Sequence, residues 1–219
     1  MKLYAFVLFA LMLAGCVENT PEERVFIAHR GVNMRYVAAG ENSLEAIRLA
    51  KRAGFKAIET DVRLTADSVL VAMHDHSLRR TCLNPDGSRV DKSFKVADFT
   101  MEQLKRDFVL RSPKQEMRTQ IPTLEEYLKV CKEEDLLVFI EPKLNDPTGC
   151  HYMDIMACAD TIFGRGNYII TSNNFANGVI RDSLGITDVP LMGILYQTTY
   201  DDIALKPDVI MAISTSRFE

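Results

Sequence analysis

The 219-residue sequence contains no tryptophan, no Cys-x-x-Cys pair and no excess of basic residues. Lysine and arginine total 26 against 30 aspartate and glutamate, a formal net charge of −4, so no long-range field favours nucleic acid. The missing cysteine pairs exclude the common zinc patterns. What is present, 47% hydrophobic and 26% charged residues, is typical of a globular protein and excludes disorder, a coiled coil and a polytopic membrane protein.

The N-terminus has the layout of a secretory signal. One lysine precedes an apolar run, residues 3–13, which is too short to span a bilayer. The run ends in Leu13-Ala-Gly-Cys16, which resembles the bacterial lipoprotein box. We expect a signal peptide over residues 1–15, a lipidated Cys16 and a polar tether over residues 16–24. The protein would then be anchored by lipid in a bacterial cell envelope, outside the cytoplasm, at the outer membrane or periplasmic face. The alternative is an ordinary signal peptide that happens to contain a cysteine.

Export would expose the remaining cysteines to an oxidising compartment, where disulfides are allowed. Cys150 and Cys158 are the pair to test first because the intervening segment is short. The alternative is that all four thiols are buried or idle. They are Cys82, Cys131, Cys150 and Cys158.

Strand-like and helix-like segments alternate along the rest of the chain, without repeats or linkers, which predicts one α/β domain over residues 25–219 with a parallel sheet. Three capping boxes begin helices at Asn42, Thr100 and Thr123. Six apolar segments are predicted as parallel strands. An open doubly wound sheet and a (β/α)₈ barrel without its last two strands both fit this pattern. The segments are Val25–Ala28, the run ending at Val62, Leu136–Ile140, Tyr168–Ile170, Leu191–Leu195 and Val209–Ile213.

Carboxylates lie within the second predicted strand and directly after the Leu136–Ile140 strand, toward the carboxyl ends where ligands bind in parallel α/β folds. Glu59 and Asp61 are two residues apart, so both point to one face of their strand, and Glu141 ends the next parallel strand. Three converging carboxylates suit a hard divalent cation, Mg²⁺ or Ca²⁺. The alternative is that Glu59 or Glu141 merely pairs with Arg30 or Lys143.

Two histidines accompany these carboxylates. His29 follows the first strand. The segment Val69–Met73 is only a short turn from the second strand, so it must return antiparallel and bring His74 back to the level of Asp61. Two histidines in one site can serve as base and acid near neutral pH. Either one alone would more simply be a satisfied or surface histidine.

An ordered set of motifs resembles the glycerophosphodiester phosphodiesterase family. The resemblance extends over residues 25–213. Its motifs are Ile27-Ala-His-Arg-Gly31, Glu41-Asn-Ser43, Ile58-Glu-Thr-Asp-Val62, Leu64-Thr-Ala-Asp67, Val71-Ala-Met-His-Asp75, Leu78-Arg-Arg-Thr81, Ile121-Pro-Thr-Leu-Glu-Glu126 and Ile140-Glu-Pro-Lys143.

The resemblance implies a phospholipase-C-like TIM barrel and one divalent cation. It implies that His29 and His74 are the general acid and base. It places the cation on Glu59, Asp61 and Glu141, and the substrate phosphate on Arg30 and Lys143. The implied reaction is hydrolysis of a glycerophosphodiester to glycerol 3-phosphate and an alcohol.

The sequence ends after the sixth predicted strand, whereas the family continues with two more. We therefore expect a barrel truncated after that strand, with bare edges on Val25–Ala28 and Val209–Ile213. Two other functions stay open. One is a non-catalytic or decayed, lipid-anchored binding protein. The other is a phospholipase-D-like enzyme of the same fold that acts on lysolipids or sphingolipids.

Overall fold

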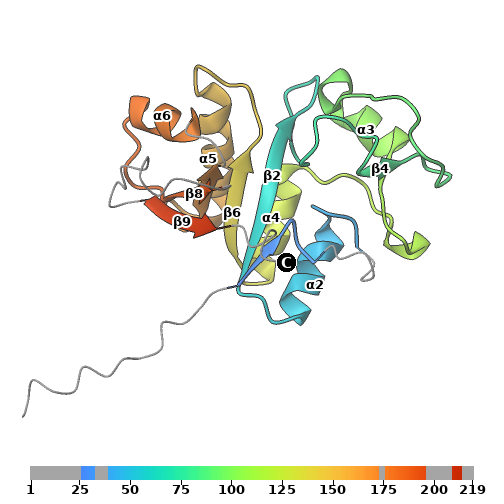
Figure 1. Cartoon of the computed structure of the whole chain (residues 1–219), viewed down its shortest axis with the longest axis horizontal. Coiled ribbons are helices and arrows are strands. Elements are labelled where there is room, and N and C mark those ends of the chain that lie inside the picture. The colour runs from blue at the N-terminus through green and yellow to red at the C-terminus, as the bar shows by residue number, and fades with distance from the viewer. Residues whose placement is uncertain (1–25, 33–38, 173–175, 196–208, 214–219) are drawn as a thin grey trace, which may run out of the picture.

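The computed structural model describes residues 26–32, 39–172, 176–195 and 209–213 (Figure 1). The predicted signal peptide, Cys16 and the tether lie outside them. Strands and helices alternate as the sequence predicts. The elements are β1 (Ile27–His29), α2 (Leu44–Arg52), β2 (Ala57–Leu64), β3 (Leu70–Ala72), β4 (Cys82–Leu83), the 3₁₀ helix η1 (Val96–Asp98), α3 (Met101–Asp107), β5 (Val109–Leu110), the 3₁₀ helix η2 (Gln115–Met117), α4 (Leu124–Glu133), β6 (Leu137–Pro142), α5 (Cys150–Phe163), β7 (Ile169–Ser172), α6 (Ala176–Ser183), β8 (Leu191–Leu195) and β9 (Val209–Ile213).

The main sheet has the strand order β1-β2-β6-β7-β8-β9, and all of these neighbours are parallel. These are the six strands that the apolar segments predict. Strand β3 pairs antiparallel with β2, which confirms the predicted hairpin. Within the described ranges β1 and β9 lie at opposite ends of this strand order, so the sheet is not closed into a barrel there.

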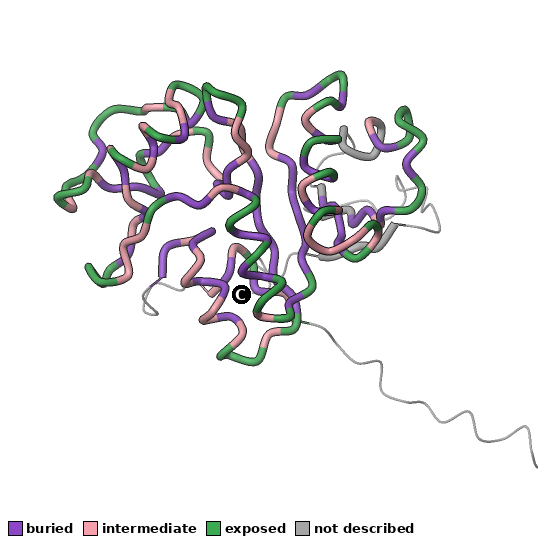
Figure 2. Tube along the Cα trace, turned by 180° about the vertical axis from the view of Figure 1, so that it is seen from behind, coloured by how far each residue is buried: buried purple, intermediate pink, exposed green. Residues whose placement is uncertain are grey.

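The two faces of the sheet have different coverings. Ile58 of β2 and Ile140 of β6 belong to a large apolar cluster that includes Tyr127 of α4 and Ile155 of α5. These two helices therefore cover the face of the sheet on which Ile58 and Ile140 lie. Full burial of one such side chain stabilises the fold by about 1.5–3 kcal/mol. The opposite face carries a small apolar cluster of Ala57, Phe139, Ile169 and Met192. Figure 2 shows the strands as mainly buried, with exposed residues along the helices and loops.

A second packed unit is inserted between β3 and α4. It contains the antiparallel pair β4–β5 and the helix α3, to one side of the main sheet (Figure 1). Phe99 meets Phe94 and Phe108 edge to face, with ring centroids 5.4 and 5.2 Å apart. These contacts give the insertion its own apolar core beside the sheet.

Two of the three capping boxes predicted from the sequence are present at the N-termini of helices α3 and α4. The hydroxyl of Thr100 accepts from the Gln103 N–H, and that of Thr123 accepts from the Glu126 N–H, with the reciprocal bonds present. The prediction at Asn42 is wrong, because Ser43 is the N-cap of α2 and accepts from the Ala46 N–H. Asn42 is buried instead, and its side chain is directed to the strand ends.

The Cys150–Cys158 pair, the first to test for a disulfide, is not bonded, and the alternative of free thiols holds. All four described cysteines are free, and these two lie on the same helix, α5. With a rise of about 1.5 Å per residue their Cα atoms stand about 12 Å apart along the axis, beyond the reach of a disulfide. Among the described residues no helix is both long and apolar enough to cross a bilayer.

Candidate active site

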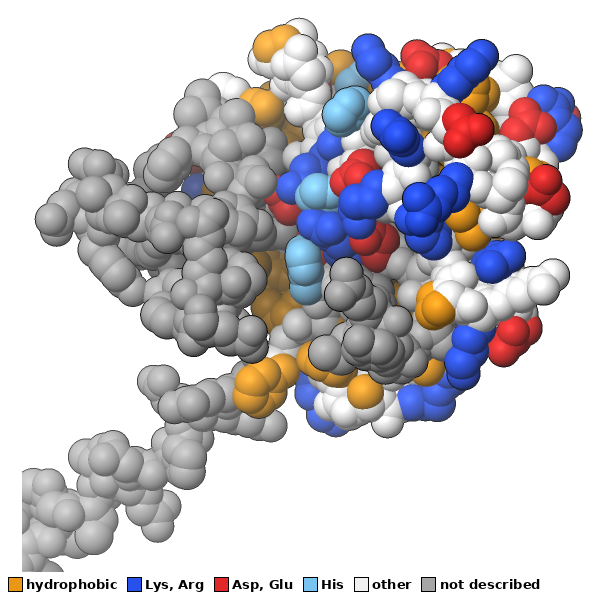
Figure 3. All heavy atoms as spheres, turned by 45° about the vertical axis from the view of Figure 1, so that its right-hand side comes forward, with side chains coloured by type: hydrophobic (Ala, Val, Ile, Leu, Met, Phe, Trp, Pro, Cys, Tyr) orange, Lys and Arg blue, Asp and Glu red, His pale blue; other side chains and the backbone are white. Residues whose placement is uncertain are grey.

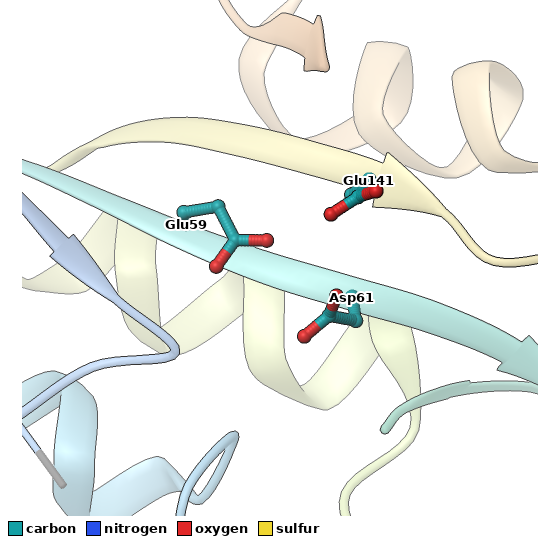
Figure 4. A group of neighbouring side chains, drawn as sticks. All are labelled: Glu59, Asp61 and Glu141. Carbon is teal, nitrogen blue, oxygen red and sulfur yellow. The ribbon is translucent and has the colours of Figure 1, made fainter. Parts of the chain in front are cut away.

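Three carboxylates converge between the middle of β2 and the end of β6. Asp61 and Glu141 occupy paired positions of the two strands, and Glu59 lies two residues before Asp61 on the same face. Each offers one oxygen, and these oxygens all lie within 4.8 Å of one another. Figure 4 shows the three side chains directed toward a common space from the two strands. The convergence predicted from the sequence is therefore present.

Burial makes this group unfavourable when it is fully ionised. Glu59, Asp61 and Glu141 are 4%, 0% and 3% exposed. Burial, followed by the charges of Asp61 and Glu141, raises the pKa of Glu59 well above its ordinary value. Burial also raises the pKa of Glu141, although Lys143 partly offsets this. A bound cation would remove the cost that these shifts express.

Two cations lie against the carboxylates. Arg30 Nε is 3.1 Å from Asp61 Oδ2. Lys143 Nζ is 2.7 Å from Glu141 Oε1 and 3.7 Å from Asp61 Oδ1. The positive charges of Arg30 and Lys143 are one fewer than the negative charges that Glu59, Asp61 and Glu141 carry when all three are ionised.

Two carboxylate oxygens also remain available. Glu59 Oε1 and Asp61 Oδ1 are buried and accept no hydrogen bond from the described residues. Ion pairing alone therefore does not account for the cluster. The oxygen-only donor set fits a divalent cation of the Mg²⁺ or Ca²⁺ type.

The turn after β1 fixes Arg30. Arg30 and Gly31 both have a positive φ, +57° and +76°. A Cβ on Gly31 would lie 2.6 Å from Ala46 Cβ, so only glycine allows α2 to pack this closely. The turn directs the Arg30 N–H to Glu59 Oε2, at 3.1 Å, and so ties β1 to the acidic group.

Both predicted histidines reach the same site. His29 Nε2 is 3.7 Å from Glu59 Oε2. The protein around the His29 ring, and then the neighbouring Arg30 cation, lower the pKa of His29, and the charge of His74 contributes to this lowering. The Met73 N–H donates to the Asp61 carbonyl at 2.9 Å, which brings His74 back to the level of Asp61 as predicted.

A chain of side chains behind His74 is absent from the sequence predictions. Asp75 Oδ1 lies 2.6 Å from His74 Nδ1. Arg80 donates to both oxygens of Asp75 and to both oxygens of Glu41, at 2.6–2.8 Å. Burial raises the pKa of Asp75, but the hydrogen bonds from Arg80 and His74 outweigh burial and hold it at about 2. Asp75 therefore stays ionised and fixes the orientation of the His74 ring.

Three more residues support the site without having been predicted. The Asn42 amide donates to Asp61 Oδ2 at 3.2 Å and accepts from the Thr60 hydroxyl at 3.0 Å. Arg63 donates to the carbonyls of His74 and Lys143, and so joins two strand ends. The motifs around Asn42, Asp75 and Arg80 were visible in the sequence, but their partners were not.

Comparison with known proteins decides the family. The profile of the glycerophosphoryl diester phosphodiesterase family matches residues 29–175, more than half of the chain. The chain belongs to this family. It is 36% identical over 129 residues to glycerophosphodiester phosphodiesterase 1 of Mus musculus, which covers 56% of this chain and 35% of the mouse protein. It is 36% identical over 118 residues to a glycerophosphodiester phosphodiesterase of Caldanaerobacter subterraneus, which covers 53% and 44%.

Solved structures show the same fold. A glycerophosphodiester phosphodiesterase from Agrobacterium tumefaciens superimposes with a TM-score of 0.60 at 23% identity, covering 78% of this chain and 66% of that one. A phosphodiesterase from Oleispira antarctica in complex with sn-glycerol 3-phosphate gives 0.59 at 24% identity, with coverage of 78% and 66%. Of the two predicted architectures, the TIM-barrel-like α/β fold of glycerophosphodiester phosphodiesterases is thus confirmed, and the open doubly wound sheet is not. The chain spans less than half the length of the two curated relatives.

Proposed function

We propose that this protein hydrolyses glycerophosphodiesters to glycerol 3-phosphate and an alcohol, with one divalent cation bound to Glu59, Asp61 and Glu141. The observation that carries the proposal is the approach of His29 and His74 to three buried carboxylates in a chain of this family. The Oleispira antarctica relative binds sn-glycerol 3-phosphate, the product that this reaction would release.

Each charged group has a role in this reaction. A bound cation would supply electrostatic stabilisation of the phosphoryl oxygens as negative charge grows on them. Arg30 and Lys143 lie beside the carboxylates and would add positive charge to the same oxygens.

The histidines would move the protons. One takes a proton from the attacking group, either water or the 2-hydroxyl of the substrate glycerol, as the new oxygen–phosphorus bond forms. Attack by water gives glycerol 3-phosphate directly, whereas attack by the 2-hydroxyl gives a cyclic phosphate, which water must then open in a second step to give glycerol 3-phosphate. The other gives a proton to the alkoxide that leaves as the old bond breaks. Asp75 Oδ1, 2.6 Å from His74 Nδ1, holds the His74 ring in one orientation for the proton transfer.

Chelation tests the proposal. The full chain is incubated with glycerophosphocholine, and released glycerol 3-phosphate is measured with EDTA, without EDTA, and after Mg²⁺ or Ca²⁺ is restored. We expect EDTA to abolish release and one of the two cations to restore it. EDTA saturated beforehand with the same cation is the control and should have no effect. Release that is insensitive to chelation contradicts the metal-dependent reaction, and no release under any condition favours a binding protein.

We also propose that Cys16 is the lipidated first residue of the mature chain, which would hold the protein in a bacterial envelope. The lipoprotein-like Leu13-Ala-Gly-Cys16 sequence behind a short apolar run supports this. Cys16→Ser should move the protein from the membrane to the soluble fraction and abolish labelling with a radioactive fatty acid. Cys150→Ser, which changes an exposed cysteine of α5, is the control. Unchanged fatty-acid labelling in Cys16→Ser would reject the anchor.

A further inference from the structure

A hollow lined by arginines lies beside the candidate active site, on the inserted unit. Its volume is about 420 Å³, and its wall includes Arg79, Arg80, Arg89 and Arg111 together with Asp75 and Asp91. Figure 3 shows lysine and arginine side chains gathered beside histidine and acidic side chains on this side of the molecule. None of the roles assigned above uses Arg79, Arg89 or Arg111.

The charge of the hollow is not balanced by the protein. Arg80 is bound to Asp75 and Glu41. The other three arginines form no ion pair with any carboxylate in the described part of the chain. Among the described residues the Arg111 side chain donates only to the Arg79 carbonyl, at 3.1 Å, and its Nε is buried without a hydrogen-bond partner there.

Three guanidinium groups therefore share one wall with a single unpaired carboxylate, that of Asp91. Guanidinium groups bind phosphate through paired, charge-assisted hydrogen bonds, so the hollow is suited to a phosphate group.

The hollow is connected directly to the acid–base group. Asp75 lines it and, at the same time, lies 2.6 Å from His74 Nδ1. If a cation on the carboxylates held the phosphoryl group of a diester beside His74, a long substituent on the side of Asp75 would extend past Asp75 into the hollow.

We infer that this hollow is a subsite for a second phosphate, carried on the alcohol of the glycerophosphodiester. The inference deepens the proposed function and rests on it. It assigns a substrate class, diesters with a phosphorylated alcohol, and assigns their recognition to Arg79, Arg89 and Arg111. A neutral or cationic alcohol gains nothing from these arginines.

The test compares two substrates that differ by one group: glycerophosphoglycerol, and the same diester with a phosphate on its distal hydroxyl. The quantity compared is the ratio of their kcat/KM values. We expect the full chain to favour the phosphorylated diester by roughly ten-fold or more. Arg89→Ala should bring the ratio close to one, mainly through KM. Arg89 offers only backbone atoms to its neighbours Leu83 and Asn84, so the variant should fold.

Arg106→Ala is the matched control, because Arg106 is an exposed arginine of α3 that pairs with Asp107 and does not line the hollow. It should keep the preference. Equal kcat/KM for the two diesters in the full chain, or a preference that survives in both Arg89→Ala and Arg79→Ala, overturns the inference.

A binding measurement separates this inference from the proposed function. Calorimetry in EDTA, where no turnover is expected, compares both diesters and inorganic phosphate. Tighter binding of the phosphorylated diester that is lost in Arg89→Ala supports the subsite even if neither diester is cleaved. In that case the proposed function fails and the subsite stands. Binding of inorganic phosphate alone, without any advantage for the phosphorylated diester, shows a free-phosphate site and rejects the subsite.

Discussion

Alanine at His29 or at His74 is expected to lower kcat for glycerophosphocholine by about 10²–10⁴-fold, the usual contribution of a general acid or base. Both imidazoles adjoin the carboxylate group, His29 through Glu59 and His74 through the return of β3 to Asp61. Neither belongs to the group of oxygens that would hold the cation. Each variant should therefore bind the cation with nearly unchanged affinity, as measured by calorimetry.

His151→Ala is the control for these variants. His151 lies on α5, pairs with the exposed Asp154, and is not among the residues that contact the carboxylate group. This variant should keep full activity, and all three should give the circular dichroism spectrum of the parent chain. Full activity in either His29→Ala or His74→Ala rejects the acid–base assignment for that residue.

A substrate with a better leaving group then distinguishes the general acid from the general base. A glycerophosphodiester of p-nitrophenol needs no proton on its leaving group, so the variant that lacks the general acid should recover much of its activity with this substrate. The variant that lacks the general base should stay slow. The variant that recovers therefore identifies the general acid, and the variant that stays slow identifies the general base. An equal recovery in both variants would contradict this division.

Glu59→Gln is expected to stabilise the metal-free protein while abolishing its activity. Burial and the charges of Asp61 and Glu141 raise the pKa of Glu59 in the folded state. A carboxyl with a raised pKa costs stability as the pH rises above its ordinary value of 4.5, and the cost grows until the folded pKa is passed. Glutamine removes that cost and still accepts the Arg30 N–H. The gain should therefore be present at pH 7 and absent at pH 4.

Thermal unfolding in EDTA and in excess Mg²⁺ or Ca²⁺ measures both effects. A cation at 100 times its Kd should stabilise the parent chain by about 2.7 kcal/mol. Glu59→Gln should show a higher Tm in EDTA at pH 7 and a much smaller increase on adding the cation. Glu102→Gln, an exposed change on α3, should behave like the parent. A lower Tm in EDTA together with an undiminished response to the cation would contradict the role of Glu59.

The sequence alone determined the strands of the main sheet and the meeting of the principal charged groups, but not β4, β5 or the two 3₁₀ helices of the inserted unit. Continuous apolar segments predict buried parallel strands, and the short link before β3 can only be a hairpin, because a parallel crossover needs a dozen or more residues. Since side chains alternate along a strand, Glu59 and Asp61 must share a face, and parallel pairing then brings Glu141 beside them. These conclusions follow from local geometry, which a sequence expresses directly.

Tertiary structure decided the features whose partners are distant in the chain. Arg80 and its partner Glu41 are 39 residues apart in the sequence, and Asn42 and its partner Asp61 are 19 residues apart. From the local sequence Asn42 resembles the N-cap of a helix. Only the tertiary structure shows that its side chain contacts Asp61 of β2 instead. The arginines of the hollow likewise come from separate segments that only the packing of the inserted unit brings together. Side-chain partners across such separations depend on the path of the whole backbone, which no periodic pattern in the sequence specifies.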